Sequence, residues 1–205
     1  LSQTYGCDNV VGASEVGYSN GNPPLMFVVM EHIEGEEFAD KLGDKTNSME
    51  TKPKIAALRD IASGLQQLHD QGIVHRDLKP ANVFIDNETG KARILDLGLS
   101  ASSEIGKQEE GFSGSLRYMS PETIAKKAQG GKSDTYSFGL MTHEMFSSSG
   151  REPSYIKDIG KRLKRRMKGD IKVSPDDYPS SIPEQTREQM ADLVNSCLKL
   201  KPYKR

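Results

Sequence analysis

The amino-acid sequence predicts an α+β fold, with strands near the amino end and helices over most of the remaining chain. Two short apolar runs, residues 10–16 and 25–30, have the composition of strands and come before any helical pattern. After residue 53, apolar residues recur at intervals of three and four in three stretches, residues 55–68, 156–167 and 190–198, which is the spacing of one helix face. The length of 205 residues allows one large domain or two small lobes.

The composition argues against several classes of protein. Residues 25–30 form the longest apolar run, far short of the ~18 residues that a membrane-spanning helix needs, so we expect no membrane partner. The 28 Lys and Arg residues balance 29 Asp and Glu residues, which leaves no whole-chain attraction for a polyanion. Cys7 and Cys197 form neither a metal-binding cluster nor a disulfide framework, which fits a reducing compartment. We therefore expect a cytoplasmic location, with the nucleus as the alternative.

The two amino-terminal strands are separated by a turn. The segment SNGNPP at residues 19–24 is rich in turn formers and joins residues 10–16 to residues 25–30. The second run is apolar throughout, which predicts a buried strand. Residues 31–40 are acidic and contain Gly35, and we interpret them as a connector between lobes.

A long helix is predicted next. Thr51 and Pro53 are helix-start signals, and Gly72 stands where a C-terminal cap belongs. The apolar residues between them fall on one helix face: Ile55, Leu58, Ile61, Ala62, Leu65 and Leu68.

A β-hairpin and a long loop follow this helix. Residues 83–85 and 92–95 are short β-rich runs separated by DNETGK, whose Asp-Asn and Gly residues favour a reversal. Residues 97–121 show no period, which is typical of a functional or disordered loop.

The last third of the sequence predicts three helices. Ser133 has the chemistry of an N-cap, and residues 136–146 are apolar on nearly every face, as in a helix buried at the centre of a lobe. Two further apolar stripes have helical spacing: Ile156, Ile159, Leu163 and Met167, then Met190, Leu193, Val194 and Leu198.

The segment HRDLKPAN at residues 75–82 carries the most specific chemistry. Asn82 directly precedes the first strand of the predicted hairpin, and Asp96 directly follows the second, so both side chains should emerge at the same end. A carboxylate and an amide oxygen are ligands that Mg²⁺ prefers, with water and phosphate oxygens completing its coordination. Asp77 and Lys79 lie just upstream and add a proton acceptor and a cation for phosphate. The sequence therefore predicts a phosphoryl-transfer site.

These motifs resemble the catalytic core of the eukaryotic protein kinase family. HRDLKPAN is similar to its catalytic loop, DLG at residues 96–98 departs from DFG by one residue, and SPE at residues 120–122 stands in for APE. The resemblance extends from about residue 9 to residue 205. It implies a two-lobe kinase-like fold, with residues 1–33 as a remnant β N-terminal lobe and hinge, and residues 34–205 as a mostly helical C-terminal lobe without its final helix.

The resemblance implies a role for each residue of the loop. Asp77 would orient the substrate hydroxyl and accept its proton, Lys79 would neutralise the transferring phosphate of ATP, and Asn82 and Asp96 would hold Mg²⁺. Ser115 matches the hydroxyl residue that serine/threonine kinases place against the catalytic Asp. Together with Lys79, it favours protein substrates with Ser or Thr acceptors.

Further roles also come only from the resemblance. Met30 looks like the gatekeeper, the segment from Glu31 to Ile33 like the hinge that meets adenine, Glu37 like a ribose contact, and Phe84 like the floor of the adenine pocket. Without the family, Phe84 is ordinary strand core and Glu37 one of several solvated acids.

Other matches concern the support of the loop and its regulation. Asp134 would anchor the catalytic-loop backbone, and Glu122 would pair with Arg205. Arg76 precedes the catalytic Asp, as in kinases activated by loop phosphorylation, with Ser113 the first candidate and Ser102 and Ser103 the next. Tyr136, Phe138 and residues 117–119 are similar to the tyrosine-kinase-like branch of the serine/threonine group.

The basic run at residues 161–168 has six cations in eight residues. Because Leu163 and Met167 continue an apolar stripe, we interpret residues 155–168 as an amphipathic helix with a solvated basic face that suits an acidic partner. Nucleic acid is the least favoured partner, since no aromatic residues interleave the run.

The sequence departs from the family at its amino end. Neither a Gly-rich GxGxxG loop nor a VAIK-like Lys is found before residue 30, so the chain begins too late for a complete upper lobe. Three hypotheses remain: an incomplete serine/threonine kinase, a non-catalytic kinase-like binding module, and a small-molecule phosphotransferase. The SPE element and the long loop argue against the third. We expect the chain as given to transfer phosphate poorly or not at all.

Overall fold

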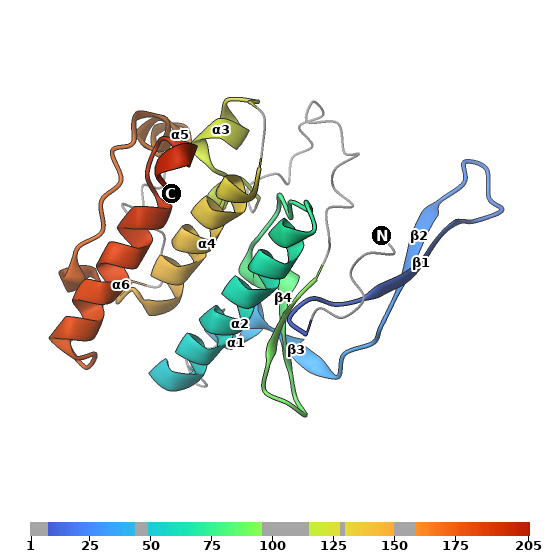
Figure 1. The fold of residues 1–205 in the computed structure, drawn as a ribbon, viewed down its shortest axis with the longest axis horizontal. Helices are drawn as coiled ribbons and strands as arrows, with labels where there is room; N and C mark the ends of the chain where they lie inside the picture. The colour runs from blue at the N-terminus through green and yellow to red at the C-terminus, as the bar shows by residue number, and fades with distance from the viewer. Residues whose placement is uncertain (1–7, 44–48, 96–114, 128–129, 150–158) are drawn as a thin grey trace. The chain divides into compact units, whose positions relative to one another are not determined.

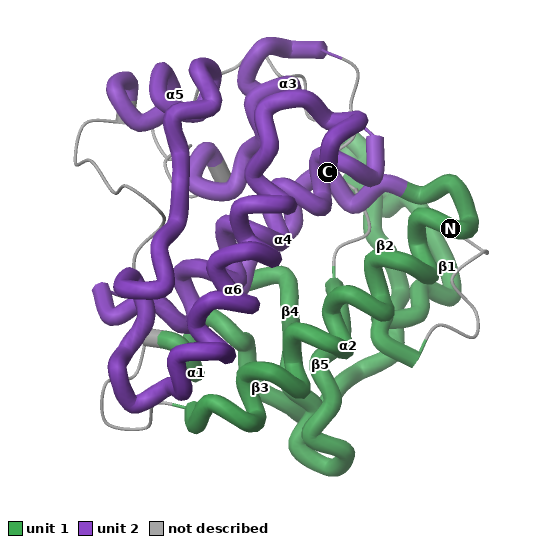
Figure 2. The backbone as a smooth tube through the Cα atoms, turned by 60° about the vertical axis from the view of Figure 1, so that its left-hand side comes forward, with its two compact units in different colours: residues 1–73, 81–97 green, residues 74–80, 98–205 purple. Residues whose placement is uncertain are grey.

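The structure is a computed structural model that describes residues 8–43, 49–95, 115–127, 130–149 and 159–205 (Figure 1). The chain divides into two compact units, residues 1–73 with 81–97 and residues 74–80 with 98–205 (Figure 2). The predicted lobe boundary between residues 33 and 34 is a different division and stays a prediction. The described strands all lie in the first unit and helices occur in both, which confirms the α+β fold. No helix in the described ranges is long and apolar enough to cross a membrane.

A β-hairpin lies at the start of the first unit (Figure 1). Its strands β1 (Ala13–Tyr18) and β2 (Met26–Met30) pair antiparallel, and a hydrogen bond from Ser19 N to Leu25 O (2.8 Å) closes the turn. β1 begins later than predicted, because Val10 instead forms an isolated parallel bridge with Ile94 of the second sheet.

The prediction that residues 25–30 form a buried strand is wrong. Met26, Phe27, Val29 and Met30 are 44%, 46%, 43% and 44% exposed. In the described part of the chain, β1 and β2 make a two-stranded sheet that joins no other named strand. A continuous apolar run is buried only where other elements cover both faces of its sheet. The two strands of a hairpin cannot cover their own faces.

The second sheet has the order β3-β4-β5 and contains the predicted hairpin. β4 (Val83–Asp86) and β5 (Ala92–Ile94) pair antiparallel, as predicted, while β3 (Gly35–Glu37) lies in the segment that we interpreted as a connector. A Cβ atom at Gly35 would collide with the carbonyl oxygen of Ile85, so glycine permits this close strand pairing. A short helix, α1 (Phe38–Gly43), follows with Phe38 fully buried.

The long helix α2 (Thr51–Asp70) is confirmed and packs against β5. Its C-terminal end is a Schellman motif, in which Gly72 N donates to His69 O (2.9 Å) and Ile73 N donates to Leu68 O (2.9 Å). Gly72 has a φ of 74°, the left-handed conformation that this motif requires. The buried face differs in part from the predicted stripe, since Ile55 and Ala62 are exposed. The buried residues are Ala57, Leu58, Ile61, Gly64, Leu65 and Leu68.

The second unit is helical. Its helices are α3 (Pro121–Ile124), α4 (Gly131–Phe146), α5 (Ile159–Lys168) and α6 (Glu184–Cys197). α4 is buried on nearly every face, as predicted, and packs along α6 (Figure 1). A Cβ atom at Gly139 would lie 2.5 Å from Cys197 Cβ, so the glycine allows this close helix contact. The N-cap of α4 is Gly130 and not Ser133, the residue predicted from the sequence. The hydroxyl of Ser133 instead donates to the carboxylate of Glu122 in α3.

The helix predicted around residues 156–167 is present as α5, but the structure does not support Met167 as part of its buried stripe. Met167 is 41% exposed and Leu163 is half-buried, whereas Arg166 is 1% exposed and is the buried side chain among those described in α5. Ile156 lies outside the described residues. Lys161, Lys164 and Lys168 are exposed, so the solvated basic face is present. α5 therefore uses a polar side chain at the position where helix packing ordinarily places an apolar one.

Candidate active site

One buried carboxylate holds the loop of residues 74–80. Asp134 of α4 is 1% exposed and accepts hydrogen bonds from His75 N at Oδ2 (2.9 Å) and from Arg76 N at Oδ1 (2.8 Å). Arg76 has a φ of 70°, a left-handed conformation that a non-glycine residue adopts at a cost in energy. Asp134 offsets that cost through both N–H groups, which confirms the anchoring role that the resemblance implies.

His75 carries this restraint on to Asp77. The imidazole is fully buried, and its Nδ1 accepts a hydrogen bond from Asp77 N (3.3 Å). Leu78 is fully buried as well, so the loop is anchored on both sides of Asp77. Asp77 and Lys79 are themselves only partly buried.

Asp77 and Lys79 form an ion pair within the loop. Lys79 Nζ lies 2.6 Å from Asp77 Oδ2, and the two side chains are 25% and 21% exposed, respectively. A carboxylate in this position can accept a proton from a hydroxyl, and the ammonium group can neutralise a phosphate oxygen. The structure thus brings together Asp77 and Lys79, the two residues for which the sequence predicts these roles.

Asn82 marks the end of the hairpin where a metal site is predicted. It ends the 3-10 turn η1 (Pro80–Asn82) and is 8% exposed, and its carbonyl accepts a hydrogen bond from Leu95 N (2.8 Å). This bond places residue 95 opposite residue 82, as the hairpin argument requires. Asp96 lies outside the described residues. Within the described ranges, no group of three or more His, Cys, Asp or Glu side chains could hold a metal. An amide and a carboxylate beside phosphate oxygens nevertheless fit a hard divalent cation.

Two of the predicted nucleotide contacts are neighbours in the second sheet. Glu37 of β3 is the register partner of Phe84 of β4, so their side chains stand on the same face. Val83 and Ile85 are 0% and 7% exposed on the opposite face, while Phe84 is only half-buried. Phe84 is therefore less buried than its two neighbours in β4, and its contact with adenine stays a prediction.

The predicted hinge, residues 31–33, directly follows the predicted gatekeeper, Met30. Met30 ends β2 and is 44% exposed, Glu31 is exposed and Ile33 is half-buried. Glu31 Oε1 accepts hydrogen bonds from Gly12 N (2.8 Å) and from the guanidinium of Arg93.

Arg93 is a site-supporting residue that the sequence analysis missed. Its Nη2 also donates to the carbonyl of Val10 (3.1 Å), so one guanidinium joins β5 to the start of the chain and to Glu31. Arg93 is opposite Phe84 in the ladder. The one signal in the sequence was a charged residue between two apolar residues of a predicted strand, which places Arg93 on the face opposite to theirs.

The segment after Ser115 is held by α4. Ser115 begins the 3-10 turn η3 (Ser115–Arg117), and its side chain lies outside the description. Glu144 of α4 accepts from Tyr118 Oη (2.6 Å) and pairs with Arg117 Nη2 (2.6 Å). Neither contact could be inferred from the sequence, because residues 136–146 predict a helix buried on nearly every face and give no sign that Glu144 pairs with another segment.

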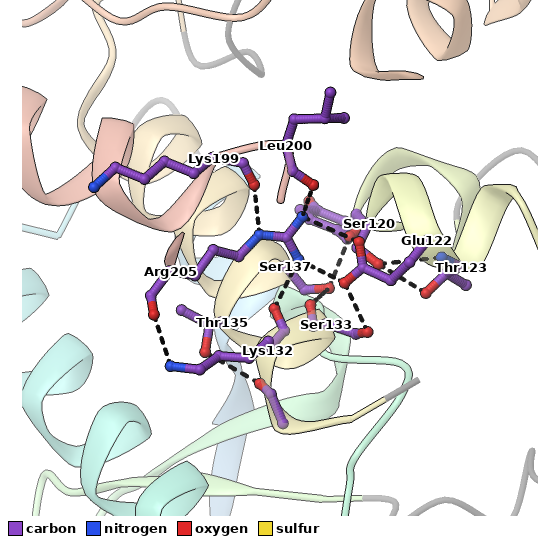
Figure 3. A network of polar contacts seen from close by, with 12 residues as sticks. Ser120, Glu122, Thr123, Lys132, Ser133, Thr135, Ser137, Lys199, Leu200 and Arg205 are labelled. Atoms are coloured by element: carbon purple, nitrogen blue, oxygen red, sulfur yellow. Dashed lines mark hydrogen bonds and ion pairs between the residues drawn. The ribbon is translucent and has the colours of Figure 1, made fainter. Parts of the chain in front are cut away.

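Residues 120–122 begin α3 and connect to the end of the chain (Figure 3). Ser120 is the N-cap of α3, and its Oγ accepts from Thr123 N (3.3 Å). Glu122 forms an ion pair with Arg205, and it accepts a further hydrogen bond from Ser133 Oγ (2.9 Å). The predicted Glu122–Arg205 pair is thus confirmed.

Three predicted phosphorylation sites, Ser102, Ser103 and Ser113, lie outside the described residues. Arg76, which would pair with the phosphate, is exposed. The activating site therefore stays a prediction.

Comparison with known proteins adds independent information. The family model described as "Protein kinase domain" matches residues 1–205. Mitogen-activated protein kinase kinase 2 of Arabidopsis thaliana is 29% identical over 208 aligned residues, which cover 100% of this chain and 55% of that protein.

Two further relatives match the chain over shorter stretches. Inhibitor of nuclear factor kappa-B kinase subunit alpha of Gallus gallus is 35% identical over 66% of this chain and 19% of that protein. Serine/threonine-protein kinase pkn2 of Myxococcus xanthus is 38% identical over 62% of this chain and 16% of that protein. The chain thus spans from about a sixth to about half of the length of these relatives.

Proposed function

The chain belongs to the protein kinase family. Because relatives such as pkn2 are named serine/threonine-protein kinases, we propose that the chain transfers the γ-phosphate of ATP to a Ser or Thr hydroxyl of a protein. The observation that carries the proposal is the Asp77–Lys79 pair, 2.6 Å apart, on a loop that Asp134 anchors through two backbone N–H groups. Such an arrangement positions a proton acceptor and a cation at fixed distances, which is most of what phosphoryl transfer asks of a protein.

In the proposed reaction, the substrate hydroxyl attacks the γ-phosphorus of ATP and breaks the bond to the β-phosphate bridging oxygen. Asp77 accepts the proton that leaves the hydroxyl. Lys79 exchanges part of its interaction with Asp77 for one with the transferring phosphate, so that its charge offsets the negative charge there. Products are the phosphorylated protein and ADP.

Kinases in general use a divalent metal with ATP, and we assign Mg²⁺ to this chain. Asn82 and Asp96 would hold it, since the carbonyl of Asn82 is paired with Leu95 and Asp96 is the next residue. Bound Mg²⁺ would neutralise charge on the phosphates.

The nucleotide base has a separate set of proposed contacts. Met30, Glu31 and Ile33 would border adenine, Glu37 would contact the ribose, and Phe84 would lie beneath the base. The shared register of Glu37 and Phe84 supports this assignment, because it places an acceptor for ribose hydroxyls beside an aromatic ring.

Selection of Ser and Thr over Tyr rests on Lys79 and Ser115. Lys79 already contacts Asp77, and a hydroxyl at position 115 would complete the recognition of the acceptor. The basic helix predicted at residues 155–168, of which the structure describes α5 (Ile159–Lys168), is the proposed surface for an acidic partner, with Lys161, Lys164 and Lys168 exposed. We expect a cytoplasmic or nuclear location.

The test is transfer of labelled phosphate from Mg-ATP to a generic basic protein rich in Ser and Thr. It is run on this chain and on the longest open reading frame that contains it. Asp77→Asn should abolish transfer, while Asp192→Asn, an exposed position on α6, should leave it unchanged. Transfer that survives in Asp77→Asn would refute the assigned mechanism.

A second candidate is a kinase-like module that binds nucleotide or protein without catalysis. Nucleotide binding by calorimetry, with no transfer by either the chain or the longer reading frame, would establish this candidate instead.

A further inference from the structure

Four consecutive backbone carbonyls, those of residues 116–119, each accept a hydrogen bond from a side chain of α4 or α5. Arg166 Nη1 donates to Leu116 O (2.8 Å) and to Met119 O (3.3 Å), and Arg166 Nη2 donates to Arg117 O. Ser137 Oγ donates to the remaining one, Tyr118 O (2.8 Å). The donors belong to helices distant in sequence from this segment, so the bonds fix its position against the helical unit.

Arg166 is an unusual choice for the buried residue of a helix. It is 1% exposed, and removing a guanidinium from water costs several kcal/mol unless its N–H groups find acceptors. The planar fork of arginine reaches three carbonyls at once, which a lysine ammonium group cannot do in a fixed geometry. An apolar residue would fill the same space at a lower cost in desolvation, so packing alone does not account for this arginine.

The side chains of the segment are restrained as well. Arg117 and Tyr118 both bind Glu144 of α4. Both the backbone and two of the four side chains are therefore held from the helical side, while Leu116 and Met119 are half-buried.

The location of the segment gives this restraint a function. This inference rests on the proposed function, in which residue 115 lies against the catalytic Asp and the substrate hydroxyl. Residues 116–119, which follow it, would then border the protein substrate. We infer that Arg166 is a positioning residue for that substrate. Because Arg166 fixes residues 116–119 before the substrate binds, no free energy of binding is lost in ordering them.

Two variants of Arg166 test this inference. Arg166→Met keeps the length and volume of the side chain but removes every donor, and Arg166→Lys keeps the charge without the fork. Arg59→Met, which removes an exposed arginine of α2, is the matched control. Each is assayed in the longest active form with the generic basic protein and Mg-ATP.

Arg166→Met should lower kcat/KM for the basic protein about tenfold or more, as expected for the loss of charge-assisted hydrogen bonds, and leave the KM for ATP within about twofold. Arg166→Lys should lie between Arg166→Met and the wild type. Unchanged kcat/KM for the protein substrate in a folded Arg166→Met variant would overturn the inference. So would equal losses for protein and ATP, because they indicate a structural role alone.

Two further measurements decide the remaining cases. If Arg166→Met does not fold, Ser137→Ala serves instead: it removes the donor to Tyr118 O, together with a longer hydrogen bond to Ser133 O within α4 (3.2 Å), and should lower kcat/KM for the protein substrate. Unchanged kcat/KM in both Ser137→Ala and Arg166→Lys would overturn the inference. If the wild type transfers no phosphate, the proposed function fails. Titration of the basic protein then decides the inference, which is overturned if wild type and Arg166→Met bind it equally.

Discussion

Arg205 and Glu122 form a two-point ion pair across 83 positions of sequence, with Nη1–Oε1 at 2.5 Å and Nη2–Oε2 at 3.0 Å. The guanidinium also donates to the carbonyls of Lys199 (2.7 Å), Leu200 (3.2 Å) and Lys132 (3.0 Å) (Figure 3). It lies 4.7 Å from the ring centre of Tyr136. The Arg205 side chain is 0% exposed and that of Glu122 8%. A pair this deeply buried joins the start of α3 to the end of the chain.

Replacement of one partner should therefore destabilise the second unit. Glu122→Gln leaves the buried Arg205 without its counter-charge, and the free energy of unfolding should fall by about 3 kcal/mol. Denaturant unfolding followed by circular dichroism measures this change. Glu188→Gln, at an exposed position on α6, should have an effect within about 0.5 kcal/mol. Equal stabilities of the two variants would contradict the prediction.

Stability should also depend on pH through Glu122. Burial raises the pKa of this carboxyl, but hydrogen bonds and charge from Arg205, together with Ser133, outweigh burial and lower the pKa below its usual 4.5. Because the folded pKa is the lower one, the stabilisation is fully present above pH 4.5 and is lost as the pH falls through the folded value. Thermal melts from pH 6 downward should show a steeper acid limb for the wild type than for Glu122→Gln.

His143 predicts a second, distinct pH dependence. Burial lowers its pKa from 6.5 to about 4, although the nearby charge of Asp177 acts in the opposite direction. The unfolded chain then binds a proton that the folded chain does not, so stability is full above pH 6.5 and falls by about 3 kcal/mol by pH 4.

The variant His143→Phe separates this effect from that of Glu122. Phenylalanine does not titrate and can still pack against the ring of Tyr178, whose centre lies 5.6 Å from that of His143. The stability of the variant should be flat between pH 6.5 and pH 5, where the wild type already loses stability. The same slope in both proteins would exclude His143 as the source.

The anchor of the proposed catalytic loop, Asp134, predicts a change in kcat without unfolding. In Asp134→Asn, an amide donor replaces one acceptor, so either His75 N or Arg76 N loses its partner and the loop shifts. Displacement of a catalytic group by about 1 Å costs ~100-fold in rate, and kcat should fall by about that factor. Initial rates with the basic protein check this, with Asp192→Asn as the control. A kcat equal to that of the wild type would show that Asp77 does not depend on the anchor.

Local signals predicted the parts of the fold that local chemistry determines. Gly72 ends α2 because only a left-handed residue completes the Schellman motif, and the β4–β5 hairpin follows from the reversal in DNETGK. The pairing of Asp134 with the catalytic loop and of Glu122 with Arg205 could be expected only from the family resemblance, because the partners are 58 or more positions apart.

The incorrect predictions share a different cause, which is that burial depends on tertiary neighbours. The apolar residues of β2 are exposed because periodicity reports what a strand could bury and not whether a covering layer exists. Arg166 was assigned to a solvated basic face, and its burial follows from three carbonyls supplied by another segment. β3 was missed because Glu36 and Glu37 are poor strand formers, and pairing with β4 overrides that preference.

Because Cys197 of α6 lies against Gly139 of α4, the reactivity of its thiol depends on whether these two helices stay in contact. Cys197 is 6% exposed, and burial raises its pKa to about 11, although Arg205 and Lys132 act in the opposite direction. The thiol is therefore almost entirely protonated at neutral pH and inert toward alkylating agents while α4 and α6 stay together. The alkylation rate of Cys197, followed by peptide mass mapping, thus measures how often these two helices separate.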